Sequence, residues 1–481
     1  MKNTILHLLI GLLLCCSCND WLDVKPKAEK EANELFETET GFKDALIACY
    51  IDLNASDLYG KSLVATDIEF LAQHWDLGLG NYGGAVPLKK FDYKSSYAES
   101  LFKRVYSKLY NVIVQANSVL SYLPEKGEVI RRTAVRGVIE GEALAIRAFC
   151  HMEILRLFGQ IPQHATVGVA LPYAEEVSIL PPSYLAFDMF VDKIFRDLDA
   201  ALVLFKEHDP VLKFGFAMLD QFNGNLSGDV FLNCRRFRFN YYAVQALKTR
   251  LFLYLGKKSE AWQLASELIS PKSEAYSRLS LGGDADFKAG NYALPSECIL
   301  ALSNPKIEKN MDEFNRARYY VEMKHYEELF AGQSMSSNNR ALKLWDKDNM
   351  NIMGNRFAKF LKYKQPVNSV GSEQMGLQKQ VVPLIRLSEI YLIAIETAPT
   401  LEEANRLYME YMKARNVVAV PLVAQTLMEE VLMEYQREFY GEGVMFYVYK
   451  RLNAKEMKWK TDRPVVEQDY IVPLPATELK K

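Results

Sequence analysis

Few features of this sequence point directly to a chemical activity. Seven of its 481 residues are cysteine, and three of these lie within the first 18 positions. The other four are widely separated and lack the spacing of metal ligands, which excludes a clustered zinc site. A chain of this length can bury a large core without cross-links, so we predict four free thiols, at Cys49, Cys150, Cys234 and Cys298.

The sequence also lacks an imbalance of charge. Its 58 basic and 60 acidic residues give a formal net charge of -2, and no long run carries one sign. Proteins that bind nucleic acid concentrate basic residues, so nucleic acid is not expected as a partner. Hydrophobic residues make up 49% and charged residues 25%, which is ordinary for a globular protein with a large core.

Motifs for nucleophilic catalysis and cofactor binding are missing as well. There is no G-x-S-x-G, and none of the six histidines has the context of a catalytic motif. His151 lies in an apolar helical run, which favours a hydrogen-bonded core histidine.

The segment 256–259 resembles a P-loop only superficially, because its flanks are helical. Asp284 and Asp286 do not begin a calcium loop, since Lys288 takes the third ligand position. We therefore expect no cofactor and no metal.

Paired carboxylates are the one catalytic arrangement that the sequence leaves open. Helical-toroid glycoside hydrolases place an acid and a base across one cleft, and this chain has 60 acidic residues to draw on. No local acidic cluster stands on an apolar loop of the kind that raises a carboxyl pKa. We expect a protein that is not an enzyme, with a glycoside hydrolase as the alternative.

The N-terminus has the pattern of an export signal. Lys2 supplies a positive charge, and an apolar run from Ile5 to Leu14 follows it. This run is too short to span a bilayer, and it ends at small residues suited to cleavage. We predict a signal peptide over residues 1–17.

The cleavage region is similar to a bacterial lipobox. Ser17 precedes Cys18, and polar residues follow, as expected when the cysteine becomes an acylated N-terminus. We predict lipidation of Cys18 and a tether over residues 18–30, because several acyl chains on one cysteine anchor a protein stably. Acylation of Cys16 and an ordinary secretory signal are the alternatives.

The clearest structural signal is the stretch from Glu140 to Pro162. Apolar residues at helical spacing cover most of its circumference, which predicts one long helix buried on several sides. Glu153 and Arg156 stand three apart on the remaining polar strip and are expected to pair. Gly159 permits a left-handed cap and Pro162 forbids continuation, so the helix should end there.

This stretch resembles the GEA-x-FLRA-x-YYF-x-L-x-RLFG-x-VP signature of the SusD/RagB family, surface lipoproteins that capture nutrients for outer-membrane importers. The matching positions are Glu142, Ala143, Arg147, Ala148, Phe149, Arg156, Leu157, Phe158, Gly159 and Pro162. Four more stretches resemble motifs of the same family: YSKLYNVIVQAN at 106–117, DKIFRDLDAAL at 192–202, VLMEYQREFYGEG at 431–443, and VPLP at 472–475 with Glu478. The family usually has Arg and Asp where Met445 and Val448 stand, so an ion pair implied by the resemblance is expected to be missing.

The helical pattern predicts a mostly α fold. Residues 240–269 and 386–413 are typical of tetratricopeptide-like helical pairs, which must stack on other helices to bury their faces. Together with helices at 101–123 and 140–159 they form a scaffold. We predict one SusD-like domain over 31–481, with long loop excursions near 54–97, 206–236 and 270–383 that hold a few short strands.

A glycan site is predicted in these excursions. A sugar ring has an apolar face and a belt of hydroxyls, so its site combines exposed aromatic rings with planar polar partners. The candidate ligand-binding residues are Asp67, His74, Trp75, Asp76, Asn81, Tyr82, Tyr292, Arg318, Tyr320 and Trp345. They lie outside the family motifs, so no role is carried over to them. Burial as a loop anchor is the alternative for Trp75 and Trp345.

The resemblance implies a location and partners. It implies a lipid-anchored protein on the cell-surface side of the outer membrane. Such a protein would bind glycans or oligosaccharides and deliver them, as a lid, to a SusC-like TonB-dependent transporter. Peptide capture by the same lid mechanism is an alternative that some RagB-like members suggest.

Overall fold

The computed structural model describes residues 27–77, 84–178, 180–220, 227–270, 279–316, 319–350, 354, 356–364 and 381–478. The predicted signal peptide, the predicted lipidation site Cys18 and most of the predicted tether lie outside the described residues. The last part of that tether, from Lys27, is already helical, because it opens helix α2.

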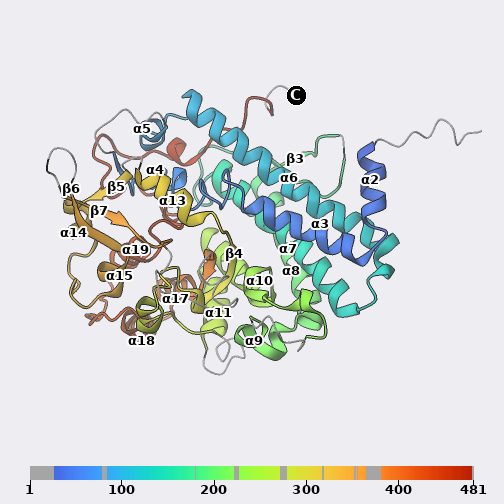
Figure 1. Ribbon diagram of the computed structural model, residues 1–481. Coiled ribbons are helices and arrows are strands. Elements are labelled where there is room, and N and C mark those ends of the chain that lie inside the picture. The colour runs from blue at the N-terminus through green and yellow to red at the C-terminus, as the bar shows by residue number, and fades with distance from the viewer. Residues whose placement is uncertain are drawn as a thin grey trace, which may run out of the picture.

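Helices dominate the described chain (Figure 1). They are α2 (Lys27–Leu35), α3 (Glu39–Leu53), α4 (Asp67–Leu71), α5 (Ala85–Lys89), α6 (Ser96–Lys126), α7 (Thr133–Phe158), α8 (Phe187–His208), α9 (Val211–Leu219), α10 (Tyr241–Tyr254), α11 (Lys258–Ile269), α12 (Asp284–Lys288), α13 (Ile307–Arg316), α14 (Met323–Leu329), α15 (Asn339–Lys343), α17 (Leu387–Thr397), α18 (Leu401–Ala414), α19 (Leu427–Glu438) and α20 (Met445–Arg451).

Helix α7 is the predicted central helix, and it packs against both α6 and α8. Its residues are buried on all sides from Gly141 to Phe158, apart from the half-buried Leu144, as the apolar pattern requires. Gly137 and Gly141 let α8 approach closely, since a Cβ at these positions would collide with the rings of His208 and Phe205.

The end of α7 corrects one expectation. Gly159 has φ -73° and ψ 170°, an extended conformation, so it is not a left-handed cap. Its N–H still donates to the Leu155 carbonyl, 3.0 Å away. The carbonyls of Leu157 and Gly159 accept instead from the buried ammonium of Lys450, at 3.3 and 2.7 Å, so a side chain from α20 caps this helix. The predicted pair of Glu153 and Arg156 is present.

The two predicted helical pairs are confirmed. Helix α10 packs against α11, α17 packs against α18, and α11 contacts α17, so the pairs stack on one another. Figure 1 shows α3, α6, α7 and α8 running side by side on the right, with the other pairs below and to the left. The result is the tetratricopeptide-like scaffold that the pattern predicts.

Strands are short and few among the described residues. They are β1 (Asp76–Leu77), β2 (Leu171–Pro172), β3 (Tyr184–Leu185), β4 (Cys298–Ser303), β5 (Tyr319–Glu322), β6 (Trp345–Met350), β7 (Arg356–Phe360) and β8 (Val381–Arg386). One four-stranded sheet has the order β1-β5-β7-β6, and each strand is antiparallel to its neighbours. β2 pairs with β3 and β4 pairs with β8, both antiparallel.

The excursions are more ordered than their composition suggests. The segment 54–97 contains α4, β1 and α5, and the segment 206–236 contains α9, which the sequence reasoning took for loop. Short helices of this kind carry too few periodic residues to be distinguished from loops. The four cysteines at 49, 150, 234 and 298 are free thiols, as predicted.

Acidic residues of the C-terminal motif are buried with arginines. The Glu438 carboxylate contacts Arg340, Arg386 and Arg415, with nitrogen–oxygen distances of 3.2, 2.7 and 2.8 Å. Buried charges require such pairing. Met445 and Val448 are buried apolar side chains, so these two positions cannot form the ion pair that the family pattern has there.

Candidate functional site

Two excursions that are far apart in the sequence meet in one sheet. Strand β1 pairs with β5, so that Asp76 lies opposite Tyr320 and Leu77 opposite Tyr319. Figure 1 places this sheet at the left end of the molecule, and α2 and α3 at the right. Tertiary structure thus brings together candidate residues from both excursions.

The two candidate tryptophans of these excursions lie beneath the surface. Trp75 is 0% exposed and Trp345 is 4% exposed. Both rings pack edge-on against Tyr440, with centroids 5.1 and 5.0 Å apart, and both contact Phe360. The Trp75 indole N–H donates to the Ala65 carbonyl at 2.9 Å. This burial corrects the expectation that either ring is exposed for stacking and fits the loop-anchor interpretation.

Three other candidates have internal partners. Asp67 accepts a hydrogen bond from the Tyr97 hydroxyl at 2.6 Å. His74 is bonded to Glu69 and stacks on Tyr440 at 4.4 Å. Tyr320 is 6% exposed and stacks on Phe357 at 4.4 Å. These contacts stabilise the sheet and the segment of chain that leads into β1.

The remaining candidates are placed elsewhere or not described. Tyr292 is half-buried and lies near Phe287 of α12, with centroids 6.4 Å apart. Asn81, Tyr82 and Arg318 lie outside the described residues.

A partly exposed aromatic group lies beside Asp76. His325 of α14 stacks on Trp459, with ring centroids 4.8 Å apart and an interplanar angle of 25°. The His325 Nδ1 lies 2.8 Å from the Asp76 Oδ1. Trp459 is half-buried, whereas Trp75 and Trp345 are buried. We call Asp76, His325 and Trp459 the Trp459 platform.

Hydrogen bonds hold this platform in place. The Trp459 indole N–H donates to Glu328 at 2.8 Å, and the second oxygen of Asp76 accepts from the Glu322 backbone N–H at 2.8 Å. Because the imidazole Nδ1 faces the carboxylate, Nε2 is the His325 nitrogen that can meet a ligand. The platform therefore combines an aromatic ring with a fixed polar group, which is the mixture that a sugar requires.

Lys89, a half-buried lysine of α5, contacts the same region. The Lys89 ammonium donates to the Trp75 carbonyl at 2.6 Å, and burial lowers the pKa of Lys89. The Lys460 ammonium lies 3.5 Å from the Lys89 carbonyl, which ties the segment carrying Trp459 to α5.

Sequence reasoning missed Trp459 and His325. Trp459 lies between two lysines outside the predicted excursions, and His325 has no motif context. Trp459 has φ +65°, a left-handed backbone that non-glycine residues rarely adopt, so its position depends on tertiary contacts. The only feature of the sequence that could have marked this site is a tryptophan within a polar segment.

Two half-buried carboxyl groups of the described residues combine a raised pKa with internal partners. Burial raises the pKa of both Asp220 and Asp286. Asp220 pairs with Arg236, and Asp286 caps α12 and accepts from Ser296. Both groups already have structural partners.

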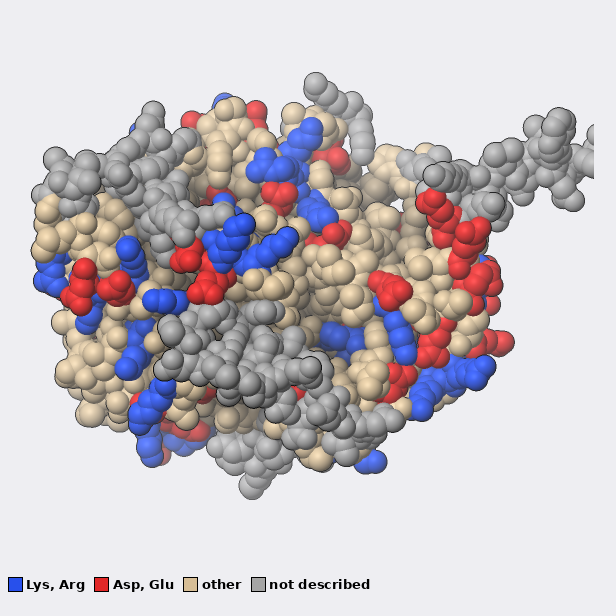
Figure 2. Space-filling view, in the orientation of Figure 1, with Lys and Arg blue, Asp and Glu red and all other residues tan. Residues whose placement is uncertain are grey.

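The described residues hold no group of three or more His, Cys, Asp or Glu side chains arranged for a metal ion. In the same residues, no helix has the length and apolar character needed to cross a membrane. Figure 2 shows basic and acidic side chains interspersed on the visible face, which is not the concentrated basic surface of a nucleic-acid-binding protein.

Comparison with known proteins places these features in a family. A model of the SusD family matches residues 300–477, and a second SusD-like model, described as starch-binding and associating with the outer membrane, matches residues 20–209. The chain belongs to the SusD family. The SusD family models thus cover both the N-terminal helices and the segment that carries the Trp459 platform.

Individual relatives are distant. SusD-like protein P25 from Formosa agariphila is 23% identical over 169 residues, which cover 34% of this chain and 31% of that protein. The match therefore spans less than a third of that relative.

Solved structures share the fold over nearly the whole chain. A SusD superfamily protein from Bacteroides thetaiotaomicron has a TM-score of 0.70 at 17% identity, with 92% of this chain and 97% of that chain covered. A laminarin-binding SusD-like protein has a TM-score of 0.64 at 17% identity, with the same coverage.

Proposed function

We propose that this SusD-family protein binds glycans at the cell surface without chemically altering them. In this proposal it is anchored in the outer membrane through acylated Cys18 and delivers its ligand, as a lid, to a SusC-like TonB-dependent transporter. The Trp459 platform is the observation that carries the binding site, because it offers a partly exposed ring beside a fixed imidazole.

Several findings support a glycan as the ligand. One matching family description is starch-binding, and one structural relative binds laminarin. Both starch and laminarin are polymers of neutral glucose, and an aromatic ring stacks well on the apolar face of such a sugar. The near-neutral net charge of the chain gives no reason to expect a strongly charged ligand.

The position of the platform supports a lid that binds on one face. The Trp459 platform lies at the end of the molecule that carries the four-stranded sheet. Helix α2, which follows the predicted anchor, lies at the other end (Figure 1). The tetratricopeptide-like helices leave further surface for a protein partner.

Binding to a panel of ligands tests this proposal. Soluble protein that begins at Asn19 would be titrated with starch, laminarin, other polysaccharides and peptides, and released reducing sugar would be measured in parallel. We expect one glucan class to bind without product. Release of reducing sugar would overturn the claim that the protein is not an enzyme, and binding of peptides alone would overturn the glycan ligand.

Variants then test the platform. Trp459→Ala should weaken glycan binding about tenfold, since a lost stacking contact costs about 1–2 kcal/mol. Trp262→Ala, which removes another half-buried tryptophan on α11, is the matched control and should bind normally. Equal affinity of the Trp459→Ala variant and the wild type would place the glycan elsewhere while leaving glycan binding itself intact.

A further inference from the structure

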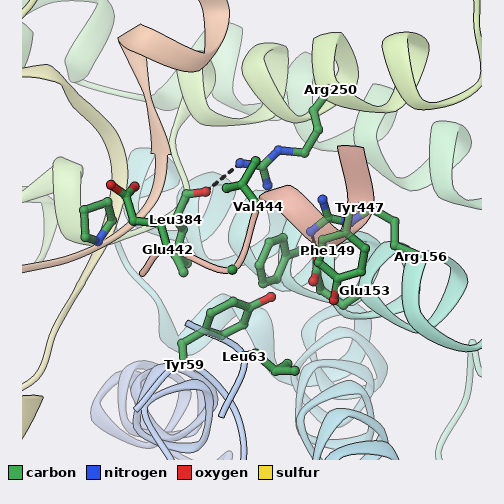
Figure 3. A pocket seen from close by; sticks show the side chains of 12 residues that line it. Tyr59, Leu63, Phe149, Glu153, Arg156, Arg250, Leu384, Glu442, Val444 and Tyr447 are labelled. Atoms are coloured by element: carbon green, nitrogen blue, oxygen red, sulfur yellow. Dashed lines mark hydrogen bonds and ion pairs between the residues drawn. The ribbon is translucent and has the colours of Figure 1, made fainter. Parts of the chain in front are cut away.

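Two small adjoining cavities lie inside the scaffold, away from the Trp459 platform. Both are lined by Arg156 of α7, Arg250 of α10, and Val444 and Tyr447 at the start of α20, and Figure 3 shows the first of them. The first also reaches Tyr59 and Glu153, and the second reaches Tyr254 and Glu389.

Each cavity is large enough for water. The volume open to the centre of a water molecule is about 20 Å³ in the first and about 30 Å³ in the second. A cavity needs roughly 10–15 Å³ by this measure to hold one molecule.

Polar atoms in the cavity walls lack partners. The hydroxyls of Tyr254 and Tyr447 and the Nε of Arg156 are buried and have no hydrogen-bond partner among the described residues. A buried polar atom without a partner costs free energy, and most such atoms in folded proteins are bonded to protein or to water. Three such atoms around two neighbouring cavities point to a ligand that the chain itself does not supply.

The charges of the walls are already balanced. Arg156 pairs with Glu153, Arg250 pairs with Glu389 at 2.6 Å, and Arg451 pairs with Glu396 at 2.5 Å. Little charge is left for an ion to neutralise. The unpartnered set contains an N–H that can only donate and hydroxyls that donate or accept, so the ligand must accept, and a neutral acceptor such as water meets this requirement.

We propose that these cavities hold ordered water molecules that bridge Arg156, Tyr254 and Tyr447. The water connects helix α7 with helices α10 and α20. It adds bridging hydrogen bonds to the direct contact of the Arg156 guanidinium with the Tyr447 ring, 4.0 Å from its centroid.

A crystal structure of the soluble chain beginning at Asn19, at a resolution that shows water, tests the proposal. Each cavity should contain at least one water whose oxygen lies about 2.6–3.2 Å from two or more of these three atoms. Empty cavities, or hydroxyls bonded directly to protein groups, would overturn it. Crystals soaked in bromide should show no anomalous peak in either cavity, and a peak there would assign an anion instead.

Variants extend the test. Tyr447→Phe removes one hydroxyl and should displace the water that it holds, while Tyr106→Phe, a buried tyrosine of α6 outside both cavities, should leave the water in place. Unchanged water density in the Tyr447→Phe variant would overturn the assigned bridge. Tyr254→Phe provides the same readout for the second cavity if Tyr447→Phe does not fold.

Discussion

Arg147 of α7 donates two hydrogen bonds to Asp197 of α8, from Nε to Oδ2 at 2.6 Å and from Nη2 to Oδ1 at 2.8 Å. The third nitrogen of this guanidinium donates to Asn117 of α6 at 3.0 Å. These residues come from three of the stretches that resemble family motifs, so the motifs meet at one buried cation. Bidentate pairing explains why arginine is suited to this position.

Removing one partner of this pair should strongly destabilise the protein. Arg147→Met leaves buried Asp197 with only the longer contact to the exposed Arg196, at 3.2 Å, and Asp197→Asn leaves the Arg147 guanidinium without its carboxylate. Each change should lower the free energy of unfolding by about 3–5 kcal/mol, as measured by urea denaturation.

An exposed pair provides the control for this prediction. Arg406 on α18 pairs with Glu403, and Arg406→Met should cost less than about 1 kcal/mol because solvent screens the interaction. Similar losses in the free energy of unfolding for Arg147→Met and Arg406→Met would contradict the central role of the buried pair.

His151 should make the fold sensitive to acid. Burial lowers the pKa of His151 to about 3, and its ring is bonded to the Arg147 carbonyl and the Ala174 N–H. The unfolded chain binds a proton near pH 6.5 and the folded chain does not, so stability is lost as the pH falls from 6.5 towards 3. The slope should approach about 1.4 kcal/mol per pH unit.

Comparison with His151→Gln isolates this contribution. Free energies of unfolding would be measured from pH 6.5 to 5, before most carboxylates titrate. The wild type should lose stability more steeply than the variant. Parallel curves would mean that His151 does not titrate differently in the folded and unfolded states.

Gly443 should not tolerate a side chain. Its φ is +70°, and a Cβ would collide with the Leu63 carbonyl oxygen, while its N–H donates to buried Glu69 at 2.7 Å. Gly443→Ala should cost about 2–4 kcal/mol from backbone strain and overpacking together. Thermal and urea unfolding would measure the loss.

Substitution of Gly332 separates the cost of backbone strain from the cost of a steric collision. This glycine also has a positive φ, +78°, but no atom lies within 4 Å of the position of a Cβ. Gly332→Ala should therefore cost only about 1–2 kcal/mol, and an equal cost at Gly443 would rule out the collision.

Trp75→Ala should affect stability rather than recognition. The side chain fills the cluster with Tyr440 and Phe360, so its removal should lower the free energy of unfolding by about 3–5 kcal/mol. The folded variant should keep the glycan affinity of the wild type. A variant that keeps its stability but loses binding would show that the Trp75 ring contacts the ligand.

The amino-acid sequence determined the scaffold by itself. The apolar period of 140–162 requires a helix with buried faces, and the pairs at 240–269 and 386–413 require stacking partners, because local periodicity specifies which faces avoid water. The pairing of Glu153 with Arg156 follows from the same local spacing.

Only tertiary structure decided the candidate site. No local pattern distinguishes a fully buried tryptophan that anchors a loop, such as Trp75, from a half-buried one, such as Trp459, because exposure depends on what packs against the ring. The pairing of β1 with β5 joins residues about 240 positions apart, and the contact of His325 with Trp459 spans another long interval. Such contacts form because the whole scaffold brings the segments together, and that arrangement is not encoded in either segment alone.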